Sequence, residues 1–153
     1  MNDSPKMSEL NYASYLHIAD LLDLQVPQSD PPEHDETLFI IIHQVYELWF
    51  KQVLHELDLA GTRFRDADLW GVAHVLKRVR MILKTLVSQI DILETMTPSS
   101  FVSFRERLDT SSGFQSMQFR CIEFRLGIKR EQVLQYLPDG LHGREDALAR
   151  YAA

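Results

Sequence analysis

Cysteine is almost absent from this 153-residue chain, in which Cys121 is the only one. A single thiol cannot form a disulfide within the chain, and it favours a reducing compartment. No apolar run reaches the roughly 18 residues of a membrane span, and the opening residues, MNDSPKMSELNY, lack the apolar core of a signal peptide. We therefore expect a cytoplasmic protein with no membrane partner.

Basic charge is also scarce. Lys and Arg together number 16 against 22 Asp and Glu, which gives a formal net charge of −6. Because binding to phosphate backbones requires a basic face, the composition argues against a nucleic-acid partner. Hydrophobic residues at 45% and charged residues at 25% are ordinary for a globular protein, and the length is sufficient for one domain with a core, residues 1–153.

What the sequence does contain is helical periodicity, with apolar residues at three- and four-residue steps and no convincing run of strands. A short amphipathic helix is expected over 12–24, followed by a loop over 25–34 that holds three prolines. Two long helices follow, one from an N-cap at Asp35 to about Arg63 and one over 66–96. The prediction is an all-α helical bundle built around two long antiparallel helices.

Shorter elements are predicted beyond them. Residues 97–100, TPSS, end the second long helix and begin another over 101–108, and a turn over 109–113 leads into a helix over 114–126 that Gly127 terminates. A further short helix is expected over 132–137, closed by 138–140. The final residues, GREDALARYAA, favour a helix but stop without a cap, which suggests that the domain is cut at its C-terminal end.

The most unusual residue of the first long helix is His43, in the run FIIIHQVYELWFKQVLHEL. Phe39, Tyr46 and Phe50 share its helical face, so an aromatic pocket could lie beside the imidazole. Glu47, one turn later, is placed to hydrogen-bond to it. A hydrogen-bonded core histidine, a metal ligand and a group facing a pocket are the alternatives, and periodicity alone does not choose among them.

Metal-binding patterns are lacking. No glutamate is followed three residues later by histidine, as a di-iron bundle requires, and HELDL at 55–59 lacks the second histidine of a zinc protease. The cationic residues of the second long helix are expected to form a solvated face; they are Lys77, Arg78, Arg80 and Lys84. A metal centre built from this chain alone is therefore not predicted.

A second polar anomaly is Arg105, which lies between Phe104 and Leu108 where an apolar side chain would be expected. The turn at 111–113, SSG, opens a predicted helix whose free N–H groups could bind an anion. These residues could be a surface arginine and an ordinary N-cap. Alternatively, they could hold two carboxylates, because a guanidinium binds a carboxylate through two parallel hydrogen bonds.

Several long blocks of this sequence resemble the tryptophan 2,3-dioxygenases, haem enzymes that open the indole ring of L-tryptophan. The blocks are DETLFIIIHQVYELWFKQVLHEL, LETMTPSSFVSFRERL and SSGFQSMQFRCIEFRLG, and NYASYLHIADLLDLQVP is similar to the N-terminal helix of that family. The resemblance extends from about Leu10 to Lys129. It implies an all-helical fold and a role for each matching residue.

His43 matches the histidine that hydrogen-bonds the indole N–H of the substrate, and Phe39 matches the aromatic residue that packs on the indole. Arg105 matches the arginine that binds the substrate carboxylate, with Leu108 lining the same pocket. The Ser112-Gly113 turn matches the turn beside the haem and its propionates. His43 would accept the indole N–H while Arg105 fixes the substrate against dioxygen bound to the haem.

The resemblance also implies what this chain would need. The cofactor is haem b, the substrates are L-tryptophan and dioxygen, and the product is N-formylkynurenine, in tryptophan catabolism by the kynurenine pathway. In relatives the histidine that ligates the haem lies in the C-terminal half. No histidine here matches it, so we expect the axial ligand outside this chain and no metal ligand within it.

The family is a homotetramer in which an N-terminal arm reaches a neighbouring subunit's site. The resemblance therefore implies that residues 1–34 are exchanged with a neighbour or packed on it, and that Tyr12, Tyr15 and Leu16 contribute to its pocket. Phe101 stands where some relatives have tyrosine. That change removes a hydroxyl but retains an aromatic wall.

Three interpretations follow. The chain could be the N-terminal part of a tryptophan 2,3-dioxygenase that is inactive alone. It could be a short dioxygenase-like protein that binds an aromatic amino acid, or completes its site with another chain, without independent catalysis. It could be a helical interaction module without a ligand, although such a module has no reason to combine Phe39, His43 and Arg105.

Overall fold

The computed structural model describes residues 10–109, 111–130, 132 and 143–152, and within these ranges it contains helices and loops but no strand. This confirms the predicted all-α class. The α-helices are α1 (Tyr12–Leu16), α2 (Ile18–Leu22), α3 (His34–Arg65), α4 (Leu69–Leu93), α5 (Pro98–Arg105), α6 (Met117–Arg125) and α7 (Arg144–Ala152). Two 3-10 turns, η1 (Glu106–Leu108) and η2 (Gly113–Gln115), separate α5 from α6.

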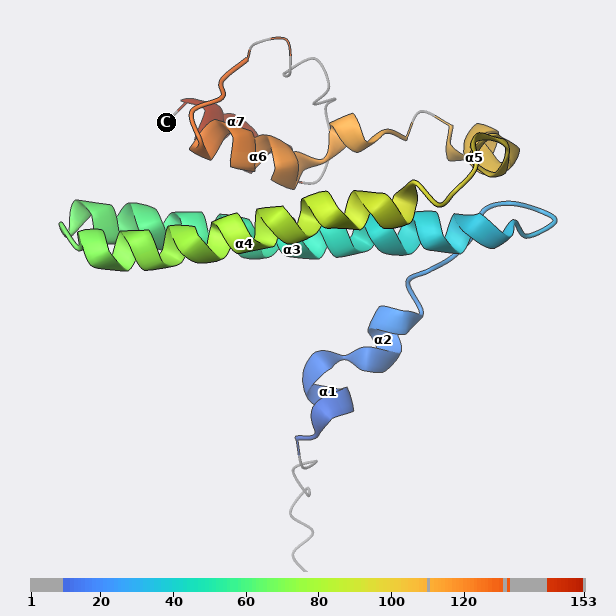
Figure 1. The fold of residues 1–153 in the computed structure, drawn as a ribbon, viewed down its shortest axis with the longest axis horizontal. Helices are drawn as coiled ribbons and strands as arrows, with labels where there is room; N and C mark the ends of the chain where they lie inside the picture. The colour runs from blue at the N-terminus through green and yellow to red at the C-terminus, as the bar shows by residue number, and fades with distance from the viewer. Residues whose placement is uncertain (1–9, 110, 131, 133–142, 153) are drawn as a thin grey trace, which may run out of the picture.

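The two long helices α3 and α4 form an antiparallel hairpin, side by side along the length of the molecule (Figure 1). Residues 66–68 make the turn between them. Ala67 has a φ of 59°, and the Asp68 side chain caps α4 by accepting a hydrogen bond from the Gly71 N–H at 2.8 Å. A Cβ at Gly71 would lie 2.0 Å from the Asp68 carboxylate, so this capped turn requires glycine there.

The main core lies where the hairpin meets α6. It consists of Phe50, Val53 and Leu57 from α3, Val79, Ile82 and Leu86 from α4, and Ile122 from α6. Burying each such side chain contributes about 1.5–3 kcal/mol to folding. The Tyr46 hydroxyl adds a polar link between the two long helices by donating to the Leu86 carbonyl oxygen at 2.5 Å.

Helices α6 and α7 pack on each other over one side of the hairpin, near one end of it (Figure 1). Met117, Cys121 and Phe124 of α6 and Ala147 of α7 form a second buried cluster. Gly127 has a φ of 84° directly after α6, which confirms its predicted role as the residue that ends this helix. The last described residues form α7, in agreement with the helix expected there.

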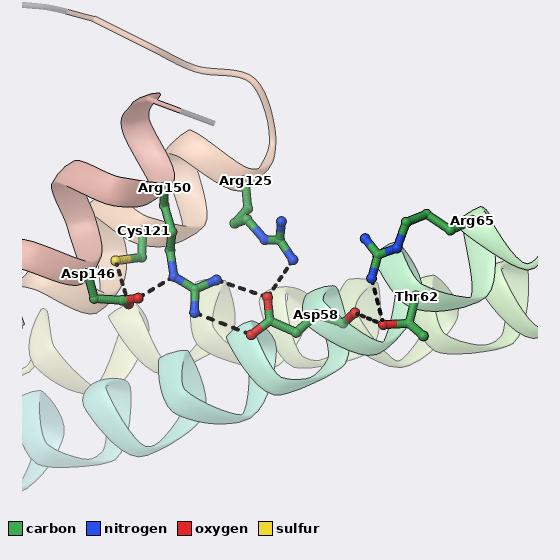
Figure 2. A network of polar contacts seen from close by, with 7 residues as sticks. All are labelled: Asp58, Thr62, Arg65, Cys121, Arg125, Asp146 and Arg150. Carbon is green, nitrogen blue, oxygen red and sulfur yellow. Dashed lines mark hydrogen bonds and ion pairs between the residues drawn. The ribbon is translucent and has the colours of Figure 1, made fainter.

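A network of charged groups joins α7 and α6 to the middle of α3 (Figure 2). The Arg150 Nη1 atom lies 2.9 Å from Asp58 Oδ1, and the Arg125 Nη2 atom lies 2.5 Å from the same oxygen. Arg150 also donates to Asp146, which in turn accepts a long hydrogen bond from the Cys121 thiol. Asp58 is therefore one of the groups that hold the C-terminal helices to the hairpin.

The N-terminal segment differs from the prediction of one helix over 12–24. His17 adopts a left-handed conformation, with a φ of 51°, and divides the segment into α1 and α2. Both short helices project from the hairpin on the side away from α6 and α7 (Figure 1). Because neither buries a residue, the part of the chain that the structure describes does not bury the predicted amphipathic face.

The expected N-cap at Asp35 is also wrong. Helix α3 begins at His34 after Glu33, with no side-chain cap. Glu36, which is fully buried, instead turns back to the preceding loop and accepts hydrogen bonds from the Gln28 N–H at 2.6 Å and the Ser29 N–H at 3.0 Å. The carboxylate therefore organises the loop rather than the helix terminus.

Lys77, Arg78, Arg80 and Lys84 are exposed, as expected. From this solvated face Arg78 also donates at 2.8 Å to the buried carboxylate of Glu56. The predicted helix over 132–137 and its closing turn lie outside the described residues, apart from position 132. In the described ranges no helix is long and apolar enough to cross a membrane.

Candidate functional site

A cavity of about 460 Å³ lies between α3, the C-terminal end of α4 and the segment that runs from η2 into α6. Its walls are mostly apolar. The lining residues are Ile42, His43, Tyr46, Glu47 and Phe50 of α3, Ile90 and Leu93 of α4, and Ser112, Gly113, Phe114, Ser116, Phe119 and Arg120 of the later segment. His43 and the 112–114 turn are exposed, so the cavity opens to solvent.

The orientation of His43 is set by its own helix. Its Nδ1 atom lies 2.7 Å from the Phe39 carbonyl oxygen, and its ring centroid lies 4.1 Å from that of Phe39. A carbonyl oxygen can only accept, so Nδ1 carries the proton and the neutral imidazole has Nε2 as an acceptor. The predicted bond to Glu47 does not form, because Glu47 accepts from Gln118 instead.

Aromatic rings surround this histidine. Phe39 meets Phe101 and Phe104 of α5 with ring centroids 5.7 and 5.5 Å apart, and Phe104 is fully buried. On the other side Phe50 lies 5.4 Å from Phe119 of α6. Of the two phenylalanine rings expected to form an aromatic pocket beside the imidazole, Phe50 lines the cavity, whereas Phe39 packs on the His43 ring but is not among the lining residues.

Arg120 of α6 is the cationic group of the cavity. Its guanidinium is almost fully buried, packs over the Phe119 ring at 4.9 Å and donates from Nη1 to Glu123. Its buried Nε–H has no hydrogen-bond partner in the structure. A buried donor left unpaired costs free energy, so this N–H is suited to an oxygen of a bound molecule.

Arg105 and Leu108 lie three positions apart in the sequence, and neither lines the cavity. Arg105 ends α5, and its Nη1 atom donates to the Asp109 carbonyl oxygen at 3.1 Å. Asp109 has a φ of 48°, a conformation that L-residues rarely adopt. Since the neighbouring Phe104 touches Phe39, Arg105 nevertheless lies beside the aromatic cluster.

The Ser112-Gly113 turn does line the cavity, but it differs from the predicted helix start. Here η2 is one 3-10 turn, in which Ser112 and Gln115 cap each other, and α6 begins only at Met117, with Ser116 as its cap. The expected single helix over 114–126 is therefore wrong. The N–H groups of Ser112 and Phe114 have local side-chain acceptors, in Gln115 and Ser112 respectively.

Tyr12, Tyr15 and Leu16 are not brought to the cavity. They lie in α1, with 76%, 67% and 42% of their surface exposed, on the opposite side of the hairpin. In contrast, Phe119 and Arg120 line the cavity although sequence reasoning did not select them. The signal for Arg120 was an arginine inside an apolar run, the same signal that identified Arg105.

No group of three histidine, cysteine, aspartate or glutamate side chains in the described parts of the chain is arranged to hold a metal ion. Cys121 is buried against α7. Burial raises the pKa of its thiol to about 11, and the nearby Asp146 carboxylate acts in the same direction. At neutral pH the thiol is therefore protonated and unreactive.

Comparison with known proteins gives a consistent result. The family model for tryptophan 2,3-dioxygenase matches residues 2–143. A tryptophan 2,3-dioxygenase from Herpetosiphon aurantiacus is 58% identical over 127 residues, which cover 83% of this chain and 49% of that protein. One from Anaeromyxobacter sp. strain K is 49% identical over 150 residues, covering 98% of this chain and 56% of that protein.

This chain thus spans about half the length of the curated relatives that it matches. Relatives from other genera are similar to this chain at comparable identity. For example, a tryptophan 2,3-dioxygenase of Xanthomonas oryzae pv. oryzae strain PXO99A is 48% identical over 134 residues. A match across nearly the whole sequence, at this identity, decides the classification. The chain belongs to the tryptophan 2,3-dioxygenase family.

Proposed function

We propose that this chain forms the substrate side of the active site of a haem-dependent tryptophan 2,3-dioxygenase, which converts L-tryptophan and dioxygen to N-formylkynurenine. The main support is His43, whose Nδ1 is bonded to the Phe39 carbonyl oxygen and whose Nε2 is an acceptor in a largely apolar cavity. A cytoplasmic location, favoured by the single buried cysteine, is part of the proposal.

The residues of the cavity fit a haem. Its apolar walls suit the macrocycle, and the unpaired, buried Nε–H of Arg120 suits a propionate oxygen. We infer that Arg120 and the Ser112-Gly113 turn hold the cofactor, while the axial ligand comes from outside this chain. When bound, the haem supplies the dioxygen chemistry.

His43 then orients the substrate. Its Nε2 atom accepts the indole N–H, because the Phe39 carbonyl oxygen fixes the proton on Nδ1. The Phe39 ring, against the imidazole, provides an apolar surface on which the indole packs. Holding the reacting carbons in one position in this way lowers the entropic part of the activation barrier.

Arg105 is the proposed anchor for the substrate carboxylate, and Leu108 is proposed to line the same pocket. Arg105 lies half-buried at the end of α5, and its one hydrogen bond in the structure leaves further N–H groups for a carboxylate. Phe101, whose ring contacts Phe39, supports the aromatic wall between the anchor and His43.

We further propose a homotetramer in which the arm of residues 1–34 lies on a neighbouring subunit. The exposure of Tyr12, Tyr15 and Leu16 supports this assignment, because the described residues of the chain leave these side chains of a five-residue helix uncovered. In that assembly these three residues contribute to the neighbour's pocket.

A haemin titration of the purified chain, followed in the Soret band with and without L-tryptophan, tests the proposed function. We expect saturable haemin binding and a tryptophan-dependent change in the spectrum. The His43→Ala variant should lose the tryptophan response. His55→Ala is the matched control, because His55 is an exposed histidine on the same helix and lies outside the cavity.

The outcomes separate the alternatives. Haemin binding that is not saturable, or that His43→Ala and His55→Ala change equally, would contradict the proposed cavity. A tryptophan signal without haemin binding would instead indicate an aromatic amino-acid binding protein.

A further inference from the structure

We propose that Glu47 and Gln118 are a positioning pair that fixes the α6 wall of the cavity against α3. The Gln118 Nε2 atom lies 2.8 Å from the Glu47 carbonyl oxygen and 2.8 Å from Glu47 Oε2. One amide group thus donates to both the main chain and the side chain of a single residue. This defines the position of α6 along α3 to within one residue.

The pair lies at the cavity itself. Glu47 is one helical turn after His43 and lines the cavity, while Gln118 directly precedes Phe119 and Arg120, which form the opposite wall. Any movement of α6 along α3 changes the separation between His43 and Arg120. The pair therefore sets the distance between the two walls of the cavity, although Gln118 itself does not line it.

Apart from this pair, the contacts near the start of α6 with the hairpin are apolar. Phe119 packs on Phe50 and Ile122 enters the hairpin core, and apolar packing is tolerant of small shifts, while Cys121 and Phe124 face α7. A hydrogen bond to a carboxylate is directional and stronger than one between neutral groups. The half-buried setting of both side chains limits competition from water.

The test uses the 153-residue chain with three substitutions: Gln118→Glu, the exchanged pair Glu47→Gln with Gln118→Glu, and Gln44→Glu as the control. Gln118→Glu places two carboxylates together, whereas the exchange restores one amide and one carboxylate. Gln44 is on the same helix and also donates a long-range hydrogen bond, to the Leu24 carbonyl oxygen, but it lies outside the cavity. Hydrogen exchange of the α6 amides and the haemin dissociation constant are measured for each.

We expect Gln118→Glu to accelerate exchange in α6 and to weaken haemin binding about tenfold, as for the loss of one charge-assisted hydrogen bond. The exchanged pair should recover part of both properties, because the bond between the two side chains can re-form but a carboxylate at position 118 cannot donate to the main-chain carbonyl oxygen. Gln44→Glu should change neither. Unchanged α6 exchange in Gln118→Glu, faster exchange with unaltered haemin affinity, or no recovery in the exchanged pair would each overturn the proposal.

This inference rests on the proposed function for its haemin measurement only. If the unsubstituted chain binds no haemin, the proposed function fails. The attachment of α6 to α3 is then judged by hydrogen exchange alone, so the two failures are distinguishable.

Discussion

The proposed role of Arg105 can be tested directly. Its guanidinium makes one hydrogen bond in the structure, to the Asp109 carbonyl oxygen, which leaves its other N–H groups for a substrate carboxylate. If it anchors the substrate carboxylate, Arg105→Ala should weaken L-tryptophan binding by about 1.5–3 kcal/mol, the contribution of hydrogen bonds to charged groups. Titration of the haemin-loaded chain with L-tryptophan measures this. Arg107→Ala, an exposed arginine two positions later, serves as the control. Equal affinities for both variants would exclude the anchor.

Glu36 illustrates how one buried carboxylate stabilises a loop. Burial raises its pKa, but the hydrogen bonds from Gln28 and Ser29 outweigh this, so the pKa lies below its ordinary value of 4.5. A group with a lowered pKa in the folded state stabilises the fold above the unfolded-state value, and this stabilisation is lost as the pH falls through the lowered pKa.

We therefore predict that Glu36→Gln destabilises the chain by about 1–3 kcal/mol at pH 7, since an amide cannot accept from both loop N–H groups. Urea denaturation from pH 7 to pH 3 measures this. The difference between Glu36→Gln and the unsubstituted chain should begin to shrink as the pH falls below the ordinary value of 4.5, and it should be lost as the pH falls through the lowered pKa of the folded state. Asp35→Asn controls for the charge at the start of α3. A difference that is constant with pH would contradict the assigned contacts.

Sequence reasoning identified the residues that stand out against an apolar background but not the contacts that they make. His43 and Phe39 were recognised, and the structure places their rings together. Arg120 was overlooked because its burial depends on tertiary packing, which the local sequence does not reveal. The ion pair of the exposed Arg78 was missed because its partner, Glu56, is 22 residues away on another helix.

Among the elements, the long helices were predictable and the short ones less so. Helix α3 covers 34–65 against a predicted 35–63, and α4 covers 69–93 against 66–96. Over many turns the apolar period outweighs local preferences. The division of 12–24 at His17 was missed because the period continues across one left-handed residue. Similarly, the η2 turn before α6 follows from the mutual capping of Ser112 and Gln115.

The turn between α3 and α4 contains a residue in an unfavourable conformation. Ala67 has a φ of 59°, where a Cβ costs roughly 1–2 kcal/mol. We predict that Ala67→Gly stabilises the chain by about 0.5–1 kcal/mol, after subtracting the extra entropy of glycine in the unfolded state. Thermal denaturation measures it. Ala73→Gly, at an exposed site inside α4, should instead destabilise by about 1 kcal/mol. If both substitutions changed the stability in the same direction, the explanation would be refuted.

At the scale of the whole molecule, Asp58 determines whether α7 stays attached to the hairpin (Figure 2). Hydrogen bonds from Arg150, followed by the charges of Arg150 and Arg125, hold the pKa of its carboxyl below the ordinary value of 3.8, despite partial burial. Its contribution to stability is therefore complete above that value and is lost only in stronger acid.

Asp58→Asn should accelerate hydrogen exchange in α7 and lower the free energy of unfolding by about 1 kcal/mol, a modest value because the aspartate is 46% exposed. The helices α3 and α4 should retain their protection. Asp91→Asn, an exposed aspartate of α4, should have no such effect. If α7 exchanges at the same rate in both variants, the network does not hold the helix.

The two walls of the cavity belong to segments that are made at different times. Glu47 and Gln118 are 71 residues apart, whereas α3 and α4 are joined by a turn of three residues. Local contacts form early and distant ones late, both in refolding and as a chain leaves the ribosome. The hairpin is therefore complete while the cavity is still a half-open groove. The cavity therefore cannot form before α6 has been made, which requires about four-fifths of this chain.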